Sequence, residues 1–593
     1  MGLGLAAIIL VGINANTPNP GTYVQVNFAA GPTGGAPQGQ KCLIIGNKTS
    51  SGTAVADTQV YGPDTATPAQ VEADVITLTG AGSQVHRAWK RFNKVNKTTP
   101  VYFICAAESA GAQATGVIVV NGTATSAGNI RFYYGDDFVD TAVNSGDTAT
   151  VIGGNIASNI NNNINWAITA VNTAGVIAIT AKNHGPEGNW IKIAVLAGPG
   201  FAPASVTVTD YGTVWAATTA YSTGVFVQPA TANGYYYKAT TGGTSGGSAP
   251  AFPTTLGTTV SDGTVTWTCW GTLSSAFGIA SLGGGATADN YTNALATLLG
   301  GNAYYDIVVC DSDATNIGRV VTQVNTQANP ITGVRQRVFA GTVDTLANAI
   351  TLATGLNAPR CELQWANATD ITPLEIAAND AAIYALFEQS GNTGYRYVGR
   401  LNYSLFPTAN PQFQDQNYWF ISASRNGSAS APTTAQITSA LNNGLTPITI
   451  LQDGTAQLVK RITSRSLNGS TADYRIRDGH KVAIMDAWAS AAATITQQQF
   501  GGKDLLDPPP PGANPQGGNP PNTFATNVNI WGGALKDLTE KMGVAGLLQN
   551  TDVTNAAAII QRESNPRTRM SASFDLQTAD IADVFAVVAN QVA

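Results

Sequence analysis

The chain has 593 residues, enough for about four domains of ordinary size. Charged side chains make up only 11% of it and apolar residues 44%, which excludes a disordered chain because such chains are charge-rich and poor in apolar residues. The net charge of −6 excludes a general nucleic-acid-binding protein, which needs a basic surface.

So few charges leave small and polar neutral residues to cover the surface. This composition suits a subunit surrounded by copies of itself, and equally an extracellular or viral β-rich protein. The cysteines are widely spaced, odd in number and without a CxxC pair, so we expect neither a zinc cluster nor a disulfide framework. Their spacing agrees with assembly in a reducing cytoplasm. They are Cys42, Cys105, Cys269, Cys310 and Cys361.

Residues 1–35 are predicted to form an N-terminal arm and hinge. The apolar run Leu3–Ile13 is too short to span a bilayer. It lacks the basic start of a secretory signal, although Ala15 lies where a signal peptide is cleaved and keeps that alternative open. The turn-rich Asn14–Gly21 precedes a strand-like segment that needs a partner, either the chain's own body or a neighbour. The apolar side chains of this segment are Tyr23, Val24, Val26 and Phe28.

Residues 36–110 are predicted to be the first part of an α/β core. Buried-strand patterns over 42–46 and 101–105 flank a helix with apolar residues at i, i+3, i+4 and i+7 from Val85 to Phe92. The other face of this helix is basic, and we expect it to be solvated or to meet an acidic neighbouring subunit. Its basic residues are Arg87, Lys90, Arg91, Lys94 and Lys97.

Two β-rich segments follow. Residues 111–209 are predicted to be an inserted β-rich domain with one helix over 147–164. Residues 210–272 are predicted to be a small aromatic-rich β module. Rows of aromatic rings can stack on sugars, but in so small a module they can equally form the core. The candidates for a glycan contact are Trp215, Trp267 and Trp270.

The α/β pattern then returns. Residues 273–430 are predicted to be the second part of the α/β core, with strands over 304–310 and 335–341. Residues 431–593 are predicted to be an α+β C-terminal domain interrupted by a Pro-rich loop at 507–521. Beyond the loop, Leu535, Leu538 and Met542 give a helical stripe. The apolar run 584–588 near the end fits either a helix or a strand.

Enzyme motifs are absent or incomplete, so no catalytic, metal or cofactor residue is predicted. The histidines, His86, His184 and His480, are expected to be surface or loop residues. The glycine-rich 34–41 segment lacks P-loop spacing and precedes a strand. Asp311 and Asp313 follow a predicted strand and are interpreted as helix-capping residues. Ser245 lies in a glycine-rich loop with no histidine signature nearby.

In their order along the chain, several stretches resemble the Mu-like family of contractile phage tail sheath proteins. One of them is HGPEGNWIKIAV at 184–195. The resemblance covers most of the chain apart from 210–272. The other stretches are 41–55, 80–108, 336–365, 442–488 and 563–591.

The resemblance implies a subtilisin-like sheath domain without a catalytic triad. It implies a homo-oligomer of stacked rings around an inner tail tube, bounded by baseplate and tail terminator proteins, in a virion tail assembled in the host cytoplasm. Contraction of this sheath drives the tube through the host envelope, without nucleic-acid binding or membrane insertion and without a cofactor.

The resemblance also implies that terminal arms complete a small sheet in an adjacent subunit, which favours a strand at the C-terminus. The predicted inter-subunit contacts are Tyr23, Val24, Val26, Phe28, Phe585, Val587 and Val588. A weak tube contact is predicted at Leu535, Leu538 and Met542.

Two alternatives remain open from the residues. A tail-associated adhesin would bind glycans through the tryptophans of the aromatic module and would form no tubes. An extracellular hydrolase would use the α/β core but needs a reactive serine that the sequence does not supply.

Overall fold

The computed structural model separates into two compact units. The larger is formed by Gly39–Glu388 and Thr393–Gly479, and the smaller includes His480–Ala593. Among the described residues, no helix has the length and hydrophobicity needed to cross a bilayer. The structure describes residues 40–579 apart from 66–70, 136, 197–204, 210–212, 275–278, 301–304, 312, 329–333, 367–370, 390–398, 401–431, 451–455, 474–476, 508–524 and 563–569.

The larger unit is built on a mostly parallel sheet with the order β3-β1-β19-β20-β21-β23. Antiparallel strands β2 (Val60–Tyr61), β24 (Ala456–Leu458) and β22 (Gly399–Arg400) extend its two edges. The sequence therefore predicted the α/β class correctly. The parallel strands are β1 (Cys42–Asn47), β3 (Val101–Ala106), β19 (Ile307–Val309), β20 (Arg337–Thr342), β21 (Cys361–Trp365) and β23 (Thr446–Ile450).

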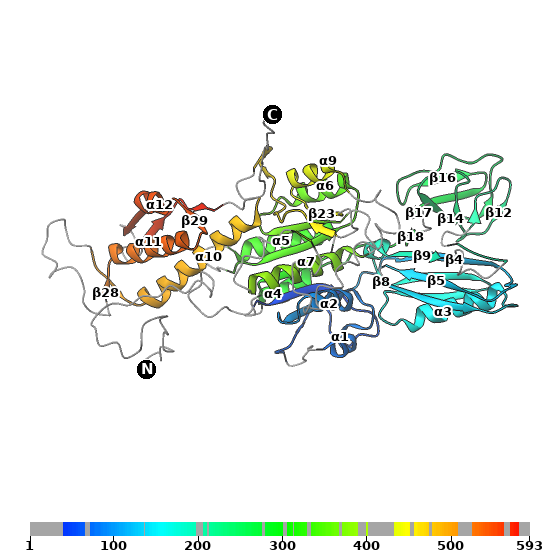
Figure 1. Ribbon diagram of the computed structural model, residues 1–593, viewed down its shortest axis with the longest axis horizontal. Coiled ribbons are helices and arrows are strands. Elements are labelled where there is room, and N and C mark those ends of the chain that lie inside the picture. The colour runs from blue at the N-terminus through cyan, green and yellow to red at the C-terminus, as the bar shows by residue number, and fades with distance from the viewer. Residues whose placement is uncertain are drawn as a thin grey trace, which may run out of the picture. The chain divides into compact units, whose positions relative to one another are not determined.

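Helices cover both faces of this sheet (Figure 1). Because side chains alternate along each strand, Leu43, Val308 and Leu363 share one buried face. That face packs against helices α4, α5, α6 and α9. Glu362 and Gln364 lie on the other face, which α2 and α7 cover. These helices are α2 (Gln84–Val95), α4 (Thr292–Gly300), α5 (Ala314–Gln327), α6 (Leu346–Leu356), α7 (Pro373–Gln389) and α9 (Thr434–Asn442).

Helix α2 forms where the apolar spacing predicts a helix. The Ser83 hydroxyl accepts a hydrogen bond from the backbone N–H of His86 and caps its first turn. Val85, Ala88 and Phe92 are fully buried, which confirms the predicted apolar face. Helix α1 (Glu72–Thr79) packs beside it.

The strand order reverses at β1, which has β3 on one side and β19 on the other. The chain between β3 and β19 holds an inserted β region, Gln113–Ser281. Its first sheet is antiparallel, with the order β10-β4-β8-β7. Helix α3 (Ala149–Asn162), which the sequence predicted over 147–164, packs on this sheet. The strands are β4 (Gln113–Gly122), β7 (Ile168–Thr173), β8 (Val176–His184) and β10 (Val206–Thr209).

A second sheet of the inserted β region crosses the predicted 209/210 boundary. Strand β17 (Val265–Ser274) is ten residues long, and it pairs along its length with β14 (Tyr235–Thr241) and at its end with β18 (Ile279–Ser281). The sheet then continues from β18 through β9 to β5 and β6. The aromatic-rich segment and the segment before it therefore share one sheet. The remaining strands on this path are β5 (Gly128–Tyr134), β6 (Asp137–Val143), β9 (Lys192–Leu196), β11 (Thr213–Val214), β13 (Phe226–Gln228) and, beside β17, β16 (Thr259–Asp262).

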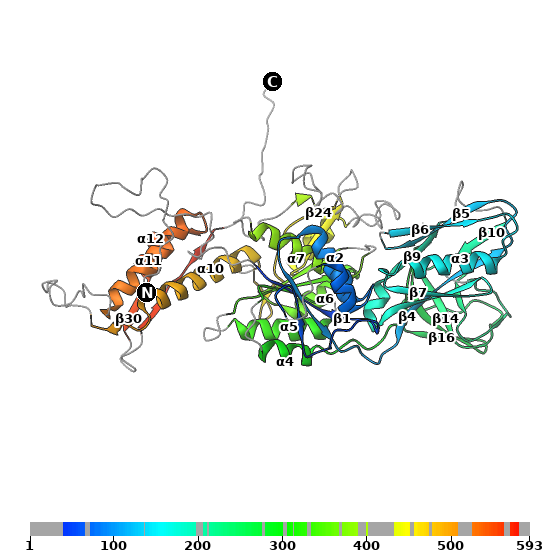
Figure 2. The same cartoon turned by 90° about the horizontal axis from the view of Figure 1, so that it is seen from below.

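The smaller unit is organised around helices α10 (Gly479–Ile495) and α11 (Val528–Val544) (Figure 2). The Trp488 indole N–H donates to Thr539 and that of Trp531 to Thr496, at 3.1 and 2.9 Å. These pairings make the helices antiparallel. Helix α12 (Thr551–Ala557) and short strand pairs complete the unit. The pairs are β27 (Asp504–Leu505) with β28 (Ala525–Thr526), β29 (Leu548–Gln549) with β32 (Gln577–Thr578), and β30 (Ile559–Arg562) with β31 (Met570–Ser573).

The boundary before this unit differs from the predicted position at 430/431. Strand β23 pairs in parallel with β21, so the chain up to Gly479 belongs to the larger unit. The physical reason is that β23 completes the sheet of the α/β core.

Beneath α7, two buried carboxylates share one buried cation. The Arg461 guanidinium donates to Glu362 at 3.1 Å and to Asp380 at 2.5 Å, and all three side chains are at most 1% exposed. Burial raises the pKa of Glu362 well above its ordinary value, Arg461 opposes this, and the Asp380 carboxylate adds to it. Burial and the neighbouring carboxylate therefore favour the protonated form of Glu362.

We expect Glu362→Gln to change the stability at pH 7 by less than about 1 kcal/mol, because an amide replaces a protonated carboxyl of the same shape. Arg461→Met leaves buried carboxylates without their cation and is expected to cost about 3–5 kcal/mol. Thermal unfolding of the two variants beside the wild-type chain measures both effects. If Glu362→Gln destabilises the chain as much as Arg461→Met, the protonated form of Glu362 is refuted.

Candidate functional site

Helix α2 holds an internal ion cluster where the sequence predicted an outward basic face. The Arg87 guanidinium lies 3.2 Å from Glu187 and 2.7 Å from Glu375, and Arg91 lies 3.0 Å from the same Glu375. Arg87 is only 5% exposed. The expectation of a solvated helix face is therefore wrong for Arg87 and Arg91, because their acidic partners come from elsewhere in the same chain.

This cluster joins three segments of the chain. Glu187 belongs to the short helix η1 (Pro186–Trp190) of the inserted β region, and Glu375 belongs to α7. Burial alone would raise the pKa of Glu375, but Arg87 and Arg91 outweigh it and lower that pKa to about 2. The carboxylate thus stabilises the fold above pH 4.5, and this contribution is lost as the pH falls toward 2.

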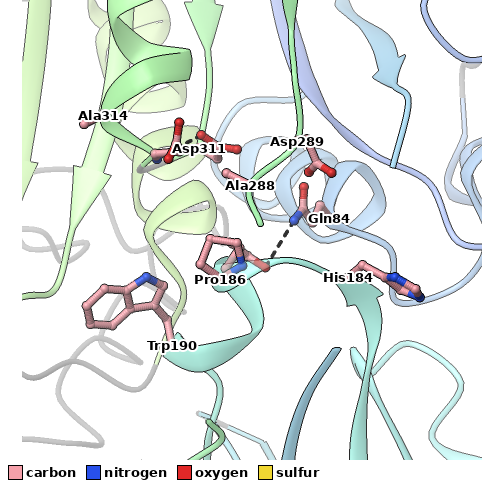
Figure 3. Close-up of a pocket in the computed structure, with 10 residues that line it drawn as sticks. Gln84, His184, Pro186, Trp190, Ala288, Asp289, Asp311 and Ala314 are labelled. Carbon is pink, nitrogen blue, oxygen red and sulfur yellow. Dashed lines mark hydrogen bonds between the residues drawn. The ribbon is translucent and has the colours of Figure 1, made fainter. Parts of the chain in front are cut away.

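A cavity of about 190 Å³ lies beside this cluster, where β1 and β19 end (Figure 3). The carboxyl edge at a change of strand order is where α/β sheets commonly bind ligands. Gln84 at the start of α2, Glu187 and Trp190 of η1, and Asp289 and Asp311 of the core all line the cavity. His184 lies at its margin, with its ring directed away from the two aspartates.

Asp289 and Asp311 are buried and held by neutral donors. Asp289 accepts hydrogen bonds from the Ser109 N–H at 2.7 Å and the Asn47 amide at 2.6 Å. Asp311 accepts hydrogen bonds from the Tyr291 hydroxyl at 2.8 Å and the Asp313 N–H at 3.0 Å. Burial raises the pKa of Asp289 to about 6 and that of Asp311 to about 7, although these hydrogen bonds oppose the shift.

Asp313 caps helix α5 by accepting from the Asn316 N–H at 2.9 Å, which confirms its predicted capping role. The sequence did not single out Glu187 or Asp289. The one local feature that could have pointed to Glu187 is its place as the acidic residue within the HGPEGNW stretch. Asp289 follows a run of small residues and has no local signature at all.

The site shows no catalytic arrangement. The described residues contain no group of His, Cys, Asp and Glu that could hold a metal ion. The Ser245 hydroxyl donates to the backbone carbonyl of Ala216 at 2.7 Å, so it serves the local fold. Most of the glycine-rich segment before Lys41 lies outside the described residues.

Two histidines are not where the sequence analysis expected them. His86 is fully buried and His480 is 1% exposed, whereas both were expected at the surface. The His86 ring accepts the Gly82 N–H through Nδ1 at 3.0 Å and lies 3.2 Å from Glu72 through Nε2. Burial lowers the pKa of His86. It is a core residue that joins α1 to α2.

The tryptophans proposed as glycan contacts are largely engaged within the protein. Trp215 and Trp267 are buried, and both indole N–H groups donate to one carboxylate oxygen of Asp262, at 2.8 and 2.9 Å. Trp270 is partly buried, donates to the Thr115 carbonyl at 3.0 Å and carries Lys238 over its ring at 4.0 Å. The ring packs so closely on Gly284 that a side chain there would collide with it.

Asp262→Ala tests this internal role. The substitution leaves the two indoles and the Gly246 N–H, which Asp262 also accepts, without an acceptor, at about 1–3 kcal/mol each. We expect faster hydrogen exchange across residues 213–274 and a red-shifted tryptophan emission. Ser261→Ala, at an exposed neighbouring position, is the control and should leave hydrogen exchange and tryptophan emission unchanged. Equal exchange in the two variants would contradict the internal role of Asp262.

The predicted tube-contact residues lie inside the smaller unit. Leu538 and Met542 pack with Ile484 and Leu548 in its core, and Leu535 is 2% exposed. Their side chains are therefore not available at the surface of the unit. The predicted arm contacts Tyr23, Val24, Val26, Phe28, Phe585, Val587 and Val588 all lie outside the described residues.

One curated protein relates the chain to a family. The Mu-like prophage FluMu tail sheath protein of Haemophilus influenzae is 30% identical over 175 residues, which is 29% of this chain and 34% of that protein. The match thus spans about a third of the relative's length. No protein-family model matches the chain.

Two solved structures of sheath tail proteins resemble this fold only loosely. A sheath tail protein of Listeria innocua is 12% identical with a TM-score of 0.40, covering 93% of this chain and 95% of that one. A sheath tail protein of Desulfitobacterium hafniense is 10% identical with a TM-score of 0.38, covering 94% and 100%. Because these scores are low, the assignment depends on the sequence match.

The curated relative is a tail sheath protein, which supports the prediction that this chain is not an enzyme. The resemblance drawn from the sequence and this match agree: over 175 residues the chain is similar to a Mu-like prophage tail sheath protein.

Proposed function

We propose that the chain is a structural subunit of a contractile phage tail sheath, located in the virion tail. The single observation that carries this proposal is the match to the Mu-like prophage tail sheath protein. The charge-poor composition supports it, since 11% charged residues leave mainly neutral surfaces that can change partners without desolvating many ions. In this proposal the parallel sheet and its helices form the subtilisin-like sheath domain.

The subunits assemble as stacked rings around an inner tail tube, between baseplate and terminator proteins, and contraction drives the tube through the host envelope. The terminal segments link neighbouring subunits by adding strands to a small sheet. The strand pairs β29–β32 and β30–β31 suit this role. Among the described residues each pair is a two-stranded sheet, so its outer edges can pair with a further strand.

We place the contact with the inner tube on the outer side of α11. The buried Leu535, Leu538 and Met542 hold this helix in the unit, while Ile530 and Val544 are 39% and 81% exposed. Two separated apolar side chains give a weak contact, which suits a tube that must slide.

The second candidate, an adhesin with a glycan-binding aromatic module, loses support from the same geometry. Trp215 and Trp267 are buried with their indole N–H groups already bonded, so they do not offer a ring face to a sugar. Glycan binding by the purified chain together with a failure to assemble would favour this candidate.

Sedimentation of the purified chain at rising concentration tests the sheath proposal. We expect the full chain to form large assemblies, and deletion of residues 1–28 or 584–593 to reduce them at least about tenfold, because β-augmentation supplies many backbone hydrogen bonds at once. Removing residues 512–519 from the Pro-rich loop is the matched control and should leave assembly intact. If all the variants and the full chain remain monomeric, the proposal fails.

A further inference from the structure

The seam between the inserted β region and the α/β core is unusually acidic. On one side stands η1 with Glu187, and on the other stand Asp289 and Asp311, around the cavity described above (Figure 3). Each of these carboxyl groups is at most 6% exposed. Asp313 lines the same cavity, so four carboxyl groups from three segments of the chain meet there.

The nearby cationic side chains already have partners. The Arg87 guanidinium contacts both Glu187 and Glu375, and the Lys48 ammonium donates to the Gly52 carbonyl at 2.9 Å. Among the described ion pairs none includes Asp289 or Asp311. Asp289 faces Glu108 and Glu187, and Asp311 faces Asp313 and Asp289. Ionising both aspartates therefore places negative charge on the core side of the seam, opposite Glu187 of η1.

We propose that this seam is a proton-operated latch: protonation of Asp289 and Asp311 tightens the packing of η1 against the α/β core, and their ionisation loosens it. The groups that can act on the latch are the carboxyl groups of Glu108, Glu187 and Asp313 and the Tyr291 hydroxyl. The cations of this region are Arg87, paired with Glu187, and Arg319, which donates to Asn316. The latch is independent of the sheath assignment, since it acts within one chain.

The sign follows from linkage. Burial raises the pKa of both groups above the value in an unfolded chain, so the closed seam binds more protons than the open one at intermediate pH. Closure is therefore favoured as the pH falls from about 7 toward 4 and weakens as the pH rises through 6 to 7. This trend opposes that of Glu375, whose stabilising charge is lost only toward pH 2.

Hydrogen exchange of the full chain, corrected for intrinsic rates, measures the latch directly. Peptides covering 184–196 and 288–295 should gain on the order of tenfold or more in protection between pH 7.5 and 5.5, as expected for two groups that titrate in this range. Peptides covering 235–274 in the same molecule are the reference and should change little.

Asp289→Asn and Asp311→Asn replace ionisable groups by permanently neutral ones. In the first variant Asn47 can rotate its amide, because its buried Oδ1 has no partner, and accept from the new amide. Either variant should raise protection at pH 7.5 and flatten the pH dependence, and the double variant should abolish it. Asp537→Asn, on the exposed side of α11, is the matched control.

The result that overturns the latch is a wild-type seam whose protection follows the reference peptides across this pH range. A wild-type pH dependence that survives unchanged in the double variant also overturns it, because other groups would then carry the effect. If the double variant does not fold, each single variant still gives a partial flattening to compare with Asp537→Asn.

Discussion

The guanidinium of Arg87 is the charge on which the arrangement of the larger unit depends. It stands on α2, contacts Glu187 of the inserted β region and contacts Glu375 of α7. Breaking a buried ion pair leaves an uncompensated charge and costs about 3–5 kcal/mol, so these three segments are coupled. Since the chain is poor in charges, each buried pair has few substitutes. The low charge content also agrees with the sharing of Arg461 by two carboxylates and with the neutral donors that hold Asp289 and Asp311 among the described residues.

The coupling has a mechanical consequence for the larger unit. The inserted β region contacts the α/β core through η1, and its second sheet continues without interruption through β17 into the aromatic-rich segment. Trp270 ties that segment to β4 through the Thr115 carbonyl. A force applied to the aromatic-rich segment is thus transmitted to the rest of the inserted β region through a continuous sheet.

Local patterns predicted the parts that depend on local chemistry. The apolar spacing from Val85 to Phe92 predicted α2, and the continuous run at 42–46 predicted a buried strand. Long-range partners could not be predicted in this way. The local sequence predicts that Arg87 is solvated, because its partners Glu187 and Glu375 lie 100 and 288 positions away. His86 and Leu535 show the same limit, since periodicity marks a buried face but not the element that covers it.

The candidate site was the least predictable part. The sequence drew attention to Asp311 because this residue follows a strand. The cavity, however, forms only because η1 and Asp289, which are separated by about a hundred residues, both lie next to Asp311 at one edge of the sheet. The family resemblance did better than the site analysis, because it draws on many weak matches in order. A sheath assignment needs no active site, so the absence of a catalytic signature in the sequence did not weaken it.

Electron microscopy of the purified chain at its highest soluble concentration distinguishes a sheath subunit from a monomeric protein. A sheath subunit should form hollow tubes or stacked rings whose repeating unit is one copy of this chain. Single particles of monomer size at every concentration would contradict the sheath proposal.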